Sequence, residues 1–317
     1  VDEAHYGAVL HDSHDEDHFH LKPIQLPRPM FGLAIRPQND ADAQKTSDAL
    51  QVAEAEDPSV QVEHNAALNE VVLLGLGELH LATVLQQIED RYSLDLVTSL
   101  PSIAYRETIT AKAEGHHRHK KQTGGAGQFG EVYLRIEPLP QGGGFEFGSA
   151  VVGGSIPSQF IPAVENGVRQ AMKEGAILGY PMQDIKVTVY DGKHHNVDSK
   201  EIAFVQAGKK AFLDAVSKAR PIVMEPIVDA EFSVPSDSVG GVTGDLSGMR
   251  GMLTRTDALP DNRALVSGKV PLQELQGYHS RLKSLTGGDG SFTMDFSHYA
   301  EIPANELKQI QAEAEEA

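Results

Sequence analysis

The sequence predicts an α+β fold of several domains, and three observations support this. The chain has 317 residues, enough for two or three domains that each bury a hydrophobic core. Residues 24–99 follow the order strand, helix, strand, strand, helix, strand, and residues 226–317 repeat it. Residues 100–225 mix strands and helices differently and contain two polar loops. We therefore expect two ferredoxin-like βαββαβ sandwiches that flank an elongated α+β middle domain with two tip loops.

The first βαββαβ module is predicted from its apolar periodicity and its helix-boundary residues. A strand at Phe31–Arg36 leads to a helix over 40–56, which we expect Asn39 or Asp40 to cap and Pro58 to end. The remaining expected elements are strands at 60–64 and 70–74, a helix with Leu81, Leu85, Ile88 and Tyr92 on one face, and a strand at 94–98.

Glu78 and His80 lie at the start of the second helix and could suggest acid–base chemistry. A catalytic pair of this kind needs a nucleophile or a third group, and the neighbouring sequence offers neither. We therefore expect both side chains to be structural.

The last module repeats the same order. Val228, Ala230, Phe232 and Val234 alternate in a first strand, as apolar residues do when one face of a sheet is buried. The other expected elements are a helix over 236–247, strands at 249–256 and 264–270, one helix that Pro271 opens and that ends before Gly287, a strand through Phe292, Met294 and Phe296, and an acidic, frayed helix over 304–317.

The middle domain should place its two loops together. Val132, Leu134 and Ile136 indicate a strand, and a helix over 161–173 is expected to end at Gly175. A second helix should bury Ala211, Phe212, Ala215, Val216 and Ala219. Asp198 and Glu201 have the spacing of a capping box, so Asp198 is interpreted as a helix cap rather than a catalyst. Anchored in this way, the two loops should be neighbours at one end.

The first loop, residues 116–130 (HHRHKKQTGGAGQFG), allows three interpretations. Gly125, Gly127 and Gly130 fit the dinucleotide pattern G-x-G-x-x-G, but that site needs a strand before it and a helix after it, and a strand follows here. A solvated turn between strands is a second interpretation. The third is contact with a nucleic-acid backbone, in which cations pair with phosphates and glycines permit close approach. The cations are Arg118, Lys120 and Lys121.

Several long segments decide between these interpretations, because they resemble bacterial elongation factor G, the translocation GTPase, in its own order. The segments are LPRPMFGLAIRP at 26–37, LLGLGELHL at 73–81, PSIAYRETI at 101–109, KKQTGGAGQFG at 120–130, DGKHHNVDSKEIAF at 191–204, VPLQELQGY at 270–278 and SFTMDFSHYAEIP at 291–303. The resemblance implies the end of a truncated β-barrel at 1–23, a third domain at 24–99, a fourth at 100–225 and a fifth at 226–317.

The resemblance also implies partners and site residues. In the family, the fourth domain's two loops enter the small-subunit decoding region and contact the tRNA–mRNA pair. The last domain contacts large-subunit RNA and the stalk base, and the third touches the family's own GTPase domain. The residues expected to contact RNA are Arg118, Lys120, Lys121, Gln122, Thr123, Gly124, Gly125, Gly127, Lys193, His194 and His195. We expect His195 to form hydrogen bonds rather than transfer protons.

Two departures from the family pattern concern these loops. Ala126 stands where many members have Arg, which removes a phosphate partner, and Lys193 and His194 replace a common Ser and Tyr. The chain could therefore come from a translocase or from a paralogue that recycles or protects ribosomes.

Net charge limits how the chain can bind RNA. The whole sequence carries −18, whereas residues 111–136 contain five cations and two carboxylates, a net of +3. RNA binding therefore has to rely on a local basic patch, which screening at a Debye length of about 8 Å allows. No apolar run approaches 18 residues and there is no cysteine, so we expect a soluble protein of the cytoplasm without membrane partner, disulfide or thiolate metal site.

Catalysis and cofactors are not expected of this chain itself. The pattern G-x-x-x-x-G-K-[ST] is absent from the sequence, so GTP and magnesium are expected only in an N-terminal domain outside it. A remote alternative is a metal- or cofactor-binding protein. It would rest on G-x-G-x-x-G or on the His- and Asp-rich residues 11–20, whose spacing does not define a tetrahedral site.

Overall fold

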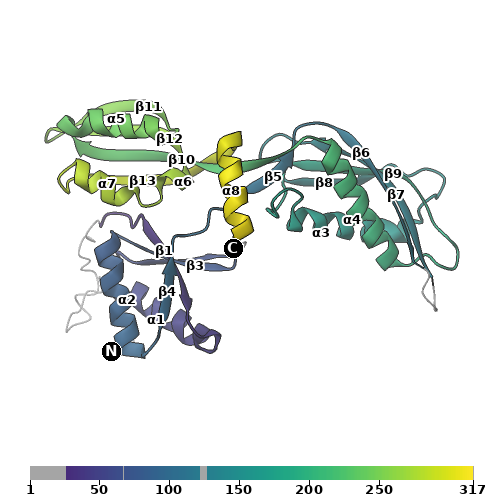
Figure 1. Cartoon of the computed structure of the whole chain (residues 1–317), viewed down its shortest axis with the longest axis horizontal. Helices are drawn as coiled ribbons and strands as arrows, with labels where there is room; N and C mark the ends of the chain where they lie inside the picture. The colour runs from purple at the N-terminus through teal and green to yellow at the C-terminus, as the bar shows by residue number, and fades with distance from the viewer. Residues whose placement is uncertain (1–25, 67, 122–126, 317) are drawn as a thin grey trace, which may run out of the picture. The chain divides into compact units, whose positions relative to one another are not determined.

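The computed structural model of the chain describes residues 26–66, 68–121 and 127–316 (Figure 1). The expected barrel end at 1–23 lies outside these residues. The described chain forms two compact units. The first contains the residues up to Ala104 together with Ile227–His298, and the second contains Tyr105–Pro226 and the residues from Tyr299 onward. Helices and strands occur together in both units, so the expected multidomain α+β class is confirmed.

The first module of unit one has the predicted order of elements. They are β1 Phe31–Pro37, α1 Ala43–Glu56, β2 Gln61–Asn65, β3 Glu70–Gly75, α2 Glu78–Tyr92 and β4 Leu96–Ser99. The four strands pair antiparallel in the order β2-β3-β1-β4. Leu50 of α1, Leu73 of β3 and Leu81 of α2 have at most 1% of their surface exposed, and they form the centre of the core.

The start of α1 differs slightly from the prediction. Asn39 caps the segment as expected, since its Oδ1 accepts a hydrogen bond from Ala41 N at 3.1 Å. The first turn, η2 at Asp40–Asp42, is a 3₁₀ turn, and α1 proper begins at Ala43. Short 3₁₀ turns are common at helix N-termini, where the sequence pattern alone does not distinguish them from α-helix.

The second module of unit one is formed by Ile227–His298, and its first and last strands continue into unit two. Its elements are β10 Pro221–Pro235, η4 Ser236–Ser238, α5 Val239–Gly248, β11 Met252–Leu259, β12 Arg263–Pro271, α6 Leu272–Leu275, α7 Tyr278–Leu285 and β13 Ser291–Glu301. Its strands follow the order β11-β12-β10-β13. Val228, Ala230, Phe232 and Val234 are buried, as their alternation predicts. The first residues of β10, Pro221–Met224, pair with β5 Arg106–Ile109, a strand that the sequence pattern did not reveal.

The single helix predicted after Pro271 is wrong, because the chain forms two short helices there. Gln276 has extended backbone, and its side chain donates to the carbonyl of Pro101 at 2.5 Å. Gly277 then adopts φ +74°, a left-handed conformation that glycine reaches without strain. The apolar positions stay in register across this break, so the periodicity of the sequence hides it.

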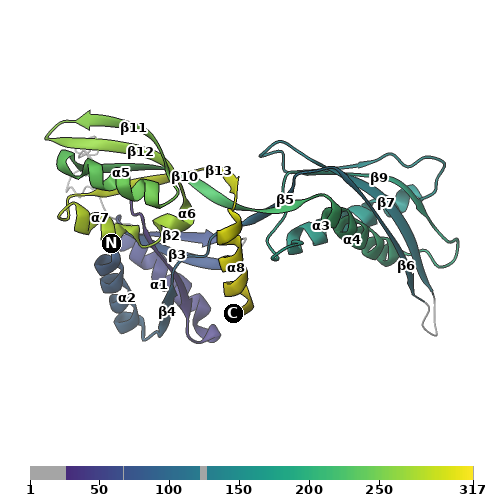
Figure 2. The same ribbon diagram turned by 45° about the horizontal axis from the view of Figure 1, so that its top comes forward.

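The middle domain forms a sheet with two helices packed against one face (Figures 1 and 2). Its elements are β6 Ala113–Lys121, β7 Gln128–Pro138, β8 Phe145–Ser149, η3 Ser158–Phe160, α3 Ile161–Glu174, β9 Ile185–Lys193 and α4 Glu201–Lys218. The strand order is β6-β7-β9-β8, with β8 parallel to β9 and the other pairs antiparallel. The predicted inward positions Val132, Leu134 and Ile136 are fully buried against the helices.

The final helix, α8, spans Ala304–Glu316. Ile310 on this helix is only 5% exposed, so its middle is packed against the rest of the protein and the expected frayed tail is wrong at this point. No helix in the described ranges has the length and apolar character needed to cross a membrane.

Candidate nucleic-acid interface

The first tip loop is shorter than the sequence suggests. Strands β6 and β7 pair without a break from Ala113 opposite Ile136 to Lys121 opposite Gln128. Residues 116–121 are therefore a strand and not part of a loop. The sequence hides this strand because its inward positions are occupied by Gly115, His117 and His119 instead of apolar residues. Residues 122–126, which include Gln122, Thr123, Gly124, Gly125 and Ala126, lie outside the described ranges.

The cations of this hairpin are presented on an open surface. Arg118 and Lys120 alternate on the face that the helices leave uncovered, and Lys121 ends the strand. All three side chains are exposed. None of them forms an ion pair with a carboxylate in the described part of the chain, so their charges are available to a ligand.

Hydrogen bonds join the second loop to the base of the first. Phe129 N donates to the carbonyl of Asp198 at 2.9 Å, and Ser199 Oγ donates to the carbonyl of Phe129 at 2.9 Å. The Phe129 and His195 rings lie 6.3 Å apart in an edge-on arrangement. A Cβ at Gly127 would lie 2.8 Å from the carboxylate of Asp198, which shows how closely the two segments approach. The described ends of the two loops are therefore neighbours.

Hydrogen bonds within its own loop orient the His195 ring and favour one tautomer. Its Nδ1 lies 3.2 Å from Asp198 N and 3.4 Å from Asp198 Oδ2. The shorter contact comes from an N–H group, which requires Nδ1 to accept, so we take Nδ1 as unprotonated and Nε2 as carrying the proton. The side chain is 56% exposed, which leaves Nε2–H as an outward-facing donor.

Asp198 does not cap α4, and the capping-box prediction is wrong. The helix begins at Glu201 with Lys200 at the N-cap, and no side chain caps it. Lys200 has the extended backbone typical of an N-cap, with φ −135° and ψ 156°. Asp198 comes two residues before this N-cap. The carbonyl and carboxylate of Asp198 instead contact Phe129 and His195, so this residue joins the two loops.

Lys193 and His194 bring a third segment to the same end of the sheet. Lys193 is opposite Glu131 in the β7–β9 register, and His194 Nδ1–H donates to the carbonyl of Ser155 at 3.1 Å. The segment 152–155 contains Val152, which is 85% exposed, and two glycines with φ +71°. The sequence prediction missed this segment, although the Gly-Gly pair between a strand and a helix was a usable turn signal.

Glu78 and His80, which we predicted to be structural, belong to unit one. His80 Nδ1 accepts from Leu76 N at 3.1 Å, and its Nε2–H donates to Asp57 at 3.0 Å. Burial raises the pKa of Asp57, but hydrogen bonds from Ser59 and His80 outweigh burial and leave that pKa below its ordinary value. His80 therefore links the turn before α2 to Asp57 at the end of α1.

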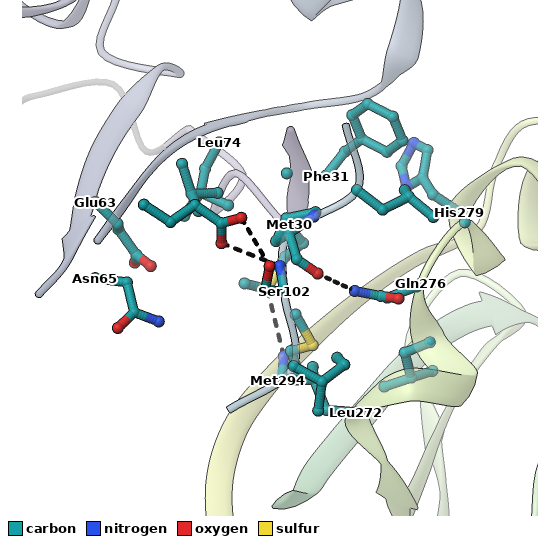
Figure 3. A pocket seen from close by; sticks show the side chains of 18 of the residues that line it. Met30, Phe31, Glu63, Asn65, Leu74, Ser102, Leu272, Gln276, His279 and Met294 are labelled. Carbon is teal, nitrogen blue, oxygen red and sulfur yellow. Dashed lines mark hydrogen bonds between the residues drawn. The ribbon is translucent and has the colours of Figure 1, made fainter. Parts of the chain in front are cut away.

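Unit one also contains an apolar pocket of about 440 Å³ (Figure 3). Phe31 and Leu74 line it from the first module, and Leu272, His279 and Met294 line it from the second. Among its polar groups, both carboxylate oxygens of Glu70 accept from Ser102 at 3.0 Å, whereas the buried Nε2 of His279 has no partner among the described residues. This arrangement provides shape and apolar surface without a nucleophile and base in contact.

The described residues contain no group of three or more His, Asp or Glu side chains that could hold a metal ion. The His-rich residues 11–20 lie outside the described ranges.

Two βαββαβ modules, together with a sheet domain that carries cations and glycines at one end, define a multidomain α+β protein. Comparison with known families identifies its class. Models of elongation factor G match residues 26–99 for domain III, 101–220 for domain IV and 222–310 for the C-terminus. The chain belongs to the elongation factor G family.

Individual relatives support this assignment. The chain is 42% identical over 298 residues to an elongation factor G from Aquifex pyrophilus, covering 93% of this chain and 42% of that protein. It is 39% identical over 308 residues to an elongation factor G-like protein from Thermotoga maritima, covering 97% and 45%. A crystal structure from Thermus thermophilus superposes with a TM-score of 0.80 at 36% identity, covering 98% and 46%. The chain thus spans less than half the length of these proteins.

Proposed function

We propose that this chain is the ribosome-engaging arm of a translational GTPase and that it promotes movement of tRNA and mRNA during protein synthesis. The observation that supports this most directly is the end of the middle domain, where two loops meet beside cations that pair with no carboxylate in the described residues. Cations and glycines at a narrow end suit contact with phosphate backbones, and a hydrogen-bond donor on His195 suits base or ribose edges.

In this proposal the small-subunit decoding region and the tRNA–mRNA pair are partners of Arg118, Lys120, Lys121, Lys193, His194 and His195, and of the loop residues 122–125 and Gly127. Large-subunit RNA and the stalk base are proposed partners of the last module. GTP and magnesium would be bound by a domain outside this sequence, and this chain would hold neither.

A second candidate is a paralogue that recycles or protects ribosomes. The replacement of a common Arg by Ala126 and the presence of Lys193 and His194 favour it, because they alter the charge of both loops. The similarity to a protein described as elongation factor G-like is compatible with either role.

The proposed ribosome contact can be tested with Lys120→Ala combined with Lys121→Ala. Each phosphate contact that is lost should reduce the slope of log affinity against log salt by roughly 0.7–0.9. Lys173→Ala with Lys210→Ala is a matched control, because both lysines are exposed on the helices α3 and α4 and the change in net charge is the same. An unchanged salt slope in the tip variant would show that Lys120 and Lys121 do not reach phosphate.

The two candidate functions can be separated with a chimera in which this chain replaces the matching region of Aquifex pyrophilus elongation factor G. Movement of tRNA and mRNA on purified ribosomes would support translocation. Ribosome binding that depends on GTP but produces no movement would instead favour the paralogue.

A further inference from the structure

We propose that the open face of the middle-domain sheet binds a short unpaired RNA segment by stacking its bases on aromatic side chains of β6, β7 and β9. The face is opposite to the one covered by α3 and α4 (Figure 2). It extends along the strands beyond the loops discussed above. The inference is independent of ribosome binding, because it concerns affinity for short RNA alone.

The first observation is a set of partly exposed rings on neighbouring strands. The His116 ring stacks on the Tyr133 ring at a centroid distance of 4.0 Å and an interplanar angle of 20°. Tyr190 of β9 lies 6.3 Å from Tyr133. Toward the loops, Phe129 occupies the same face of β7 and lies edge-on to His195. Phe129, Tyr133 and Tyr190 are each partly exposed, so part of every ring is open to a ligand.

The second observation is that cations surround these rings. The Arg118 guanidinium lies 5.2 Å from the centre of the Phe129 ring, and Lys120 is opposite Phe129 in the strand register. Lys193 lies two strands away in the same row as Arg118. None of these three cations is ion-paired to a described carboxylate. They can therefore reach the phosphates of a strand whose bases stack on the rings.

The third observation is that the acid in the centre of the face is buried and is hydrogen-bonded through only one of its two oxygens. Glu131 is 5% exposed. Its Oε1 accepts from His116 Nε2–H at 2.9 Å and from Tyr133 O–H at 3.3 Å, whereas its buried Oε2 has no partner among the described residues. The exposed carboxylates, Asp191 and Glu114, lie level with Tyr133 or farther from the loops. The half of the face nearest the loops is therefore cationic.

The spacing of the rings defines the size of the ligand. Phe129 and Tyr133 are four residues apart on β7, which corresponds to about 13 Å of strand. Sheets that stack roughly two or three RNA bases in this way are a common solution for single-stranded RNA. A duplex hides the faces of its bases, so the surface suits an unpaired segment.

The test compares two fluorescein-labelled RNAs at the same salt concentration: hexaadenylate and an abasic chain of the same length. Both carry the same phosphates, and only hexaadenylate has bases to stack. We expect the 317-residue chain to bind hexaadenylate at least about 5-fold more tightly, the lower limit for one stacked base. Equal affinity for the two RNAs, or no binding of either at low salt, would overturn the proposal without the need for any variant.

Two substitutions then locate the binding surface. Tyr133→Leu removes the ring, and we expect hexaadenylate to bind about 5- to 150-fold more weakly. Tyr133→Phe retains the ring and loses only the hydroxyl group, so its affinity should stay close to that of the original chain. Equal losses in both variants would show that the Tyr133 ring does not stack on a base. Ribosome binding by the Lys120 and Lys121 variants is a separate measurement, so failure of either proposal can be recognised.

Discussion

Glu107 is a fully buried carboxylate that holds a loop through backbone hydrogen bonds. Its oxygens accept from Ala176, Ile177, Leu178 and Tyr180 N–H groups at distances of 2.5–3.1 Å. Nearby backbone also depends on this residue, because Gln183 N donates to its carbonyl at 2.9 Å. A buried charge with four N–H partners is well compensated, and it orders a loop that has no regular structure of its own.

We expect Glu107→Gln to destabilise unit two. The amide oxygen of Gln can still accept from some of the four backbone N–H groups. The amide NH₂ is a donor, so the N–H groups that it faces lose their acceptor, and each such loss costs roughly 1–3 kcal/mol. Urea unfolding and hydrogen exchange of residues 176–180 would measure this. Glu146→Gln is the control, because Glu146 is 53% exposed in its ion pair with Lys186. Similar small losses in both variants would contradict the role given to Glu107.

The two nitrogens of His195 have different tasks, and two substitutions can separate them. Asn places its polar group near the position of Nδ1, where it can accept from Asp198 N but cannot reach outward. Gln extends to the position of the Nε2–H donor. We therefore expect His195→Asn to weaken ribosome binding by about 2- to 10-fold, the value of one hydrogen bond, and His195→Gln to weaken it less. The reverse order would show that the loop bond at Nδ1 matters more.

At the level of elements, α3 and α4 approach each other through glycine. A Cβ at Gly167 would overlap the carbonyl oxygen of Val205, and a Cβ at Gly208 would lie 2.7 Å from the carbonyl oxygen of Val164. Neither contact can be relieved by rotating a side chain, because the neighbouring atoms belong to the backbone. The packing of these helices, and with it the position of the sheet beneath them, depends on these two residues.

We expect Gly167→Ala to destabilise unit two by about 1–3 kcal/mol, because overpacking against backbone outweighs the higher helix propensity of Ala. Gly240→Ala in α5 is the opposite case, since a Cβ added there would have nothing within 4 Å. There the substitution should stabilise unit one by about 0.5–1 kcal/mol. Thermal unfolding would show both effects, and a stabilising Gly167→Ala would contradict the packing argument.

The elements that could be predicted from sequence are those whose burial follows a regular period. Strand β7 and helix α4 were predicted because Val132, Leu134 and Phe212 occupy positions that the period places inward. Strand β6 was not predicted because glycine and histidine, and not apolar residues, occupy its inward positions. The break between α6 and α7 at Gly277 was not predicted because the apolar period continues across it. The link between Asp198 and Phe129 could not be predicted, since it depends on two segments that are distant in sequence.

At the scale of the whole molecule, the net negative charge repels RNA, whereas a local group of cations on the middle domain can attract it. The chain carries −18, so distant RNA is repelled on average, while the open face and loop end of the middle domain present Arg118, Lys120, Lys121 and Lys193 without paired carboxylates among the described residues. Screening over about 8 Å at physiological salt confines the repulsion, and it lets a patch of this size act locally.

Because Asp245 lies in unit one, its protonation should lower the stability of unit one and leave the stability of unit two unchanged. This carboxylate accepts from Arg281 Nε at 2.8 Å and from Tyr278 O–H at 3.2 Å, which holds α5 to α7 in unit one. The hydrogen bond from Arg281, more than the opposing effect of burial, keeps the pKa of Asp245 below its ordinary value. The native state therefore binds fewer protons than the unfolded chain, so this contribution is present above about pH 4 and is lost as pH falls below it.

We expect Asp245→Asn to reduce the difference in unit-one stability between about pH 6 and about pH 3, because the group that gains a proton on unfolding has been removed. Unit two, which includes α3 and α4, does not contain Asp245, so the stability that it loses in acid should be the same with and without the substitution. Urea unfolding followed through amide NMR signals of α5 and α7, and separately of α3 and α4, measures the two responses. Asp237→Asn is the matched control, because Asp237 is exposed in the same module. An equal change in both units would mean that they unfold as one cooperative body, and an unchanged unit one would mean that Asp245 does not govern its acid response.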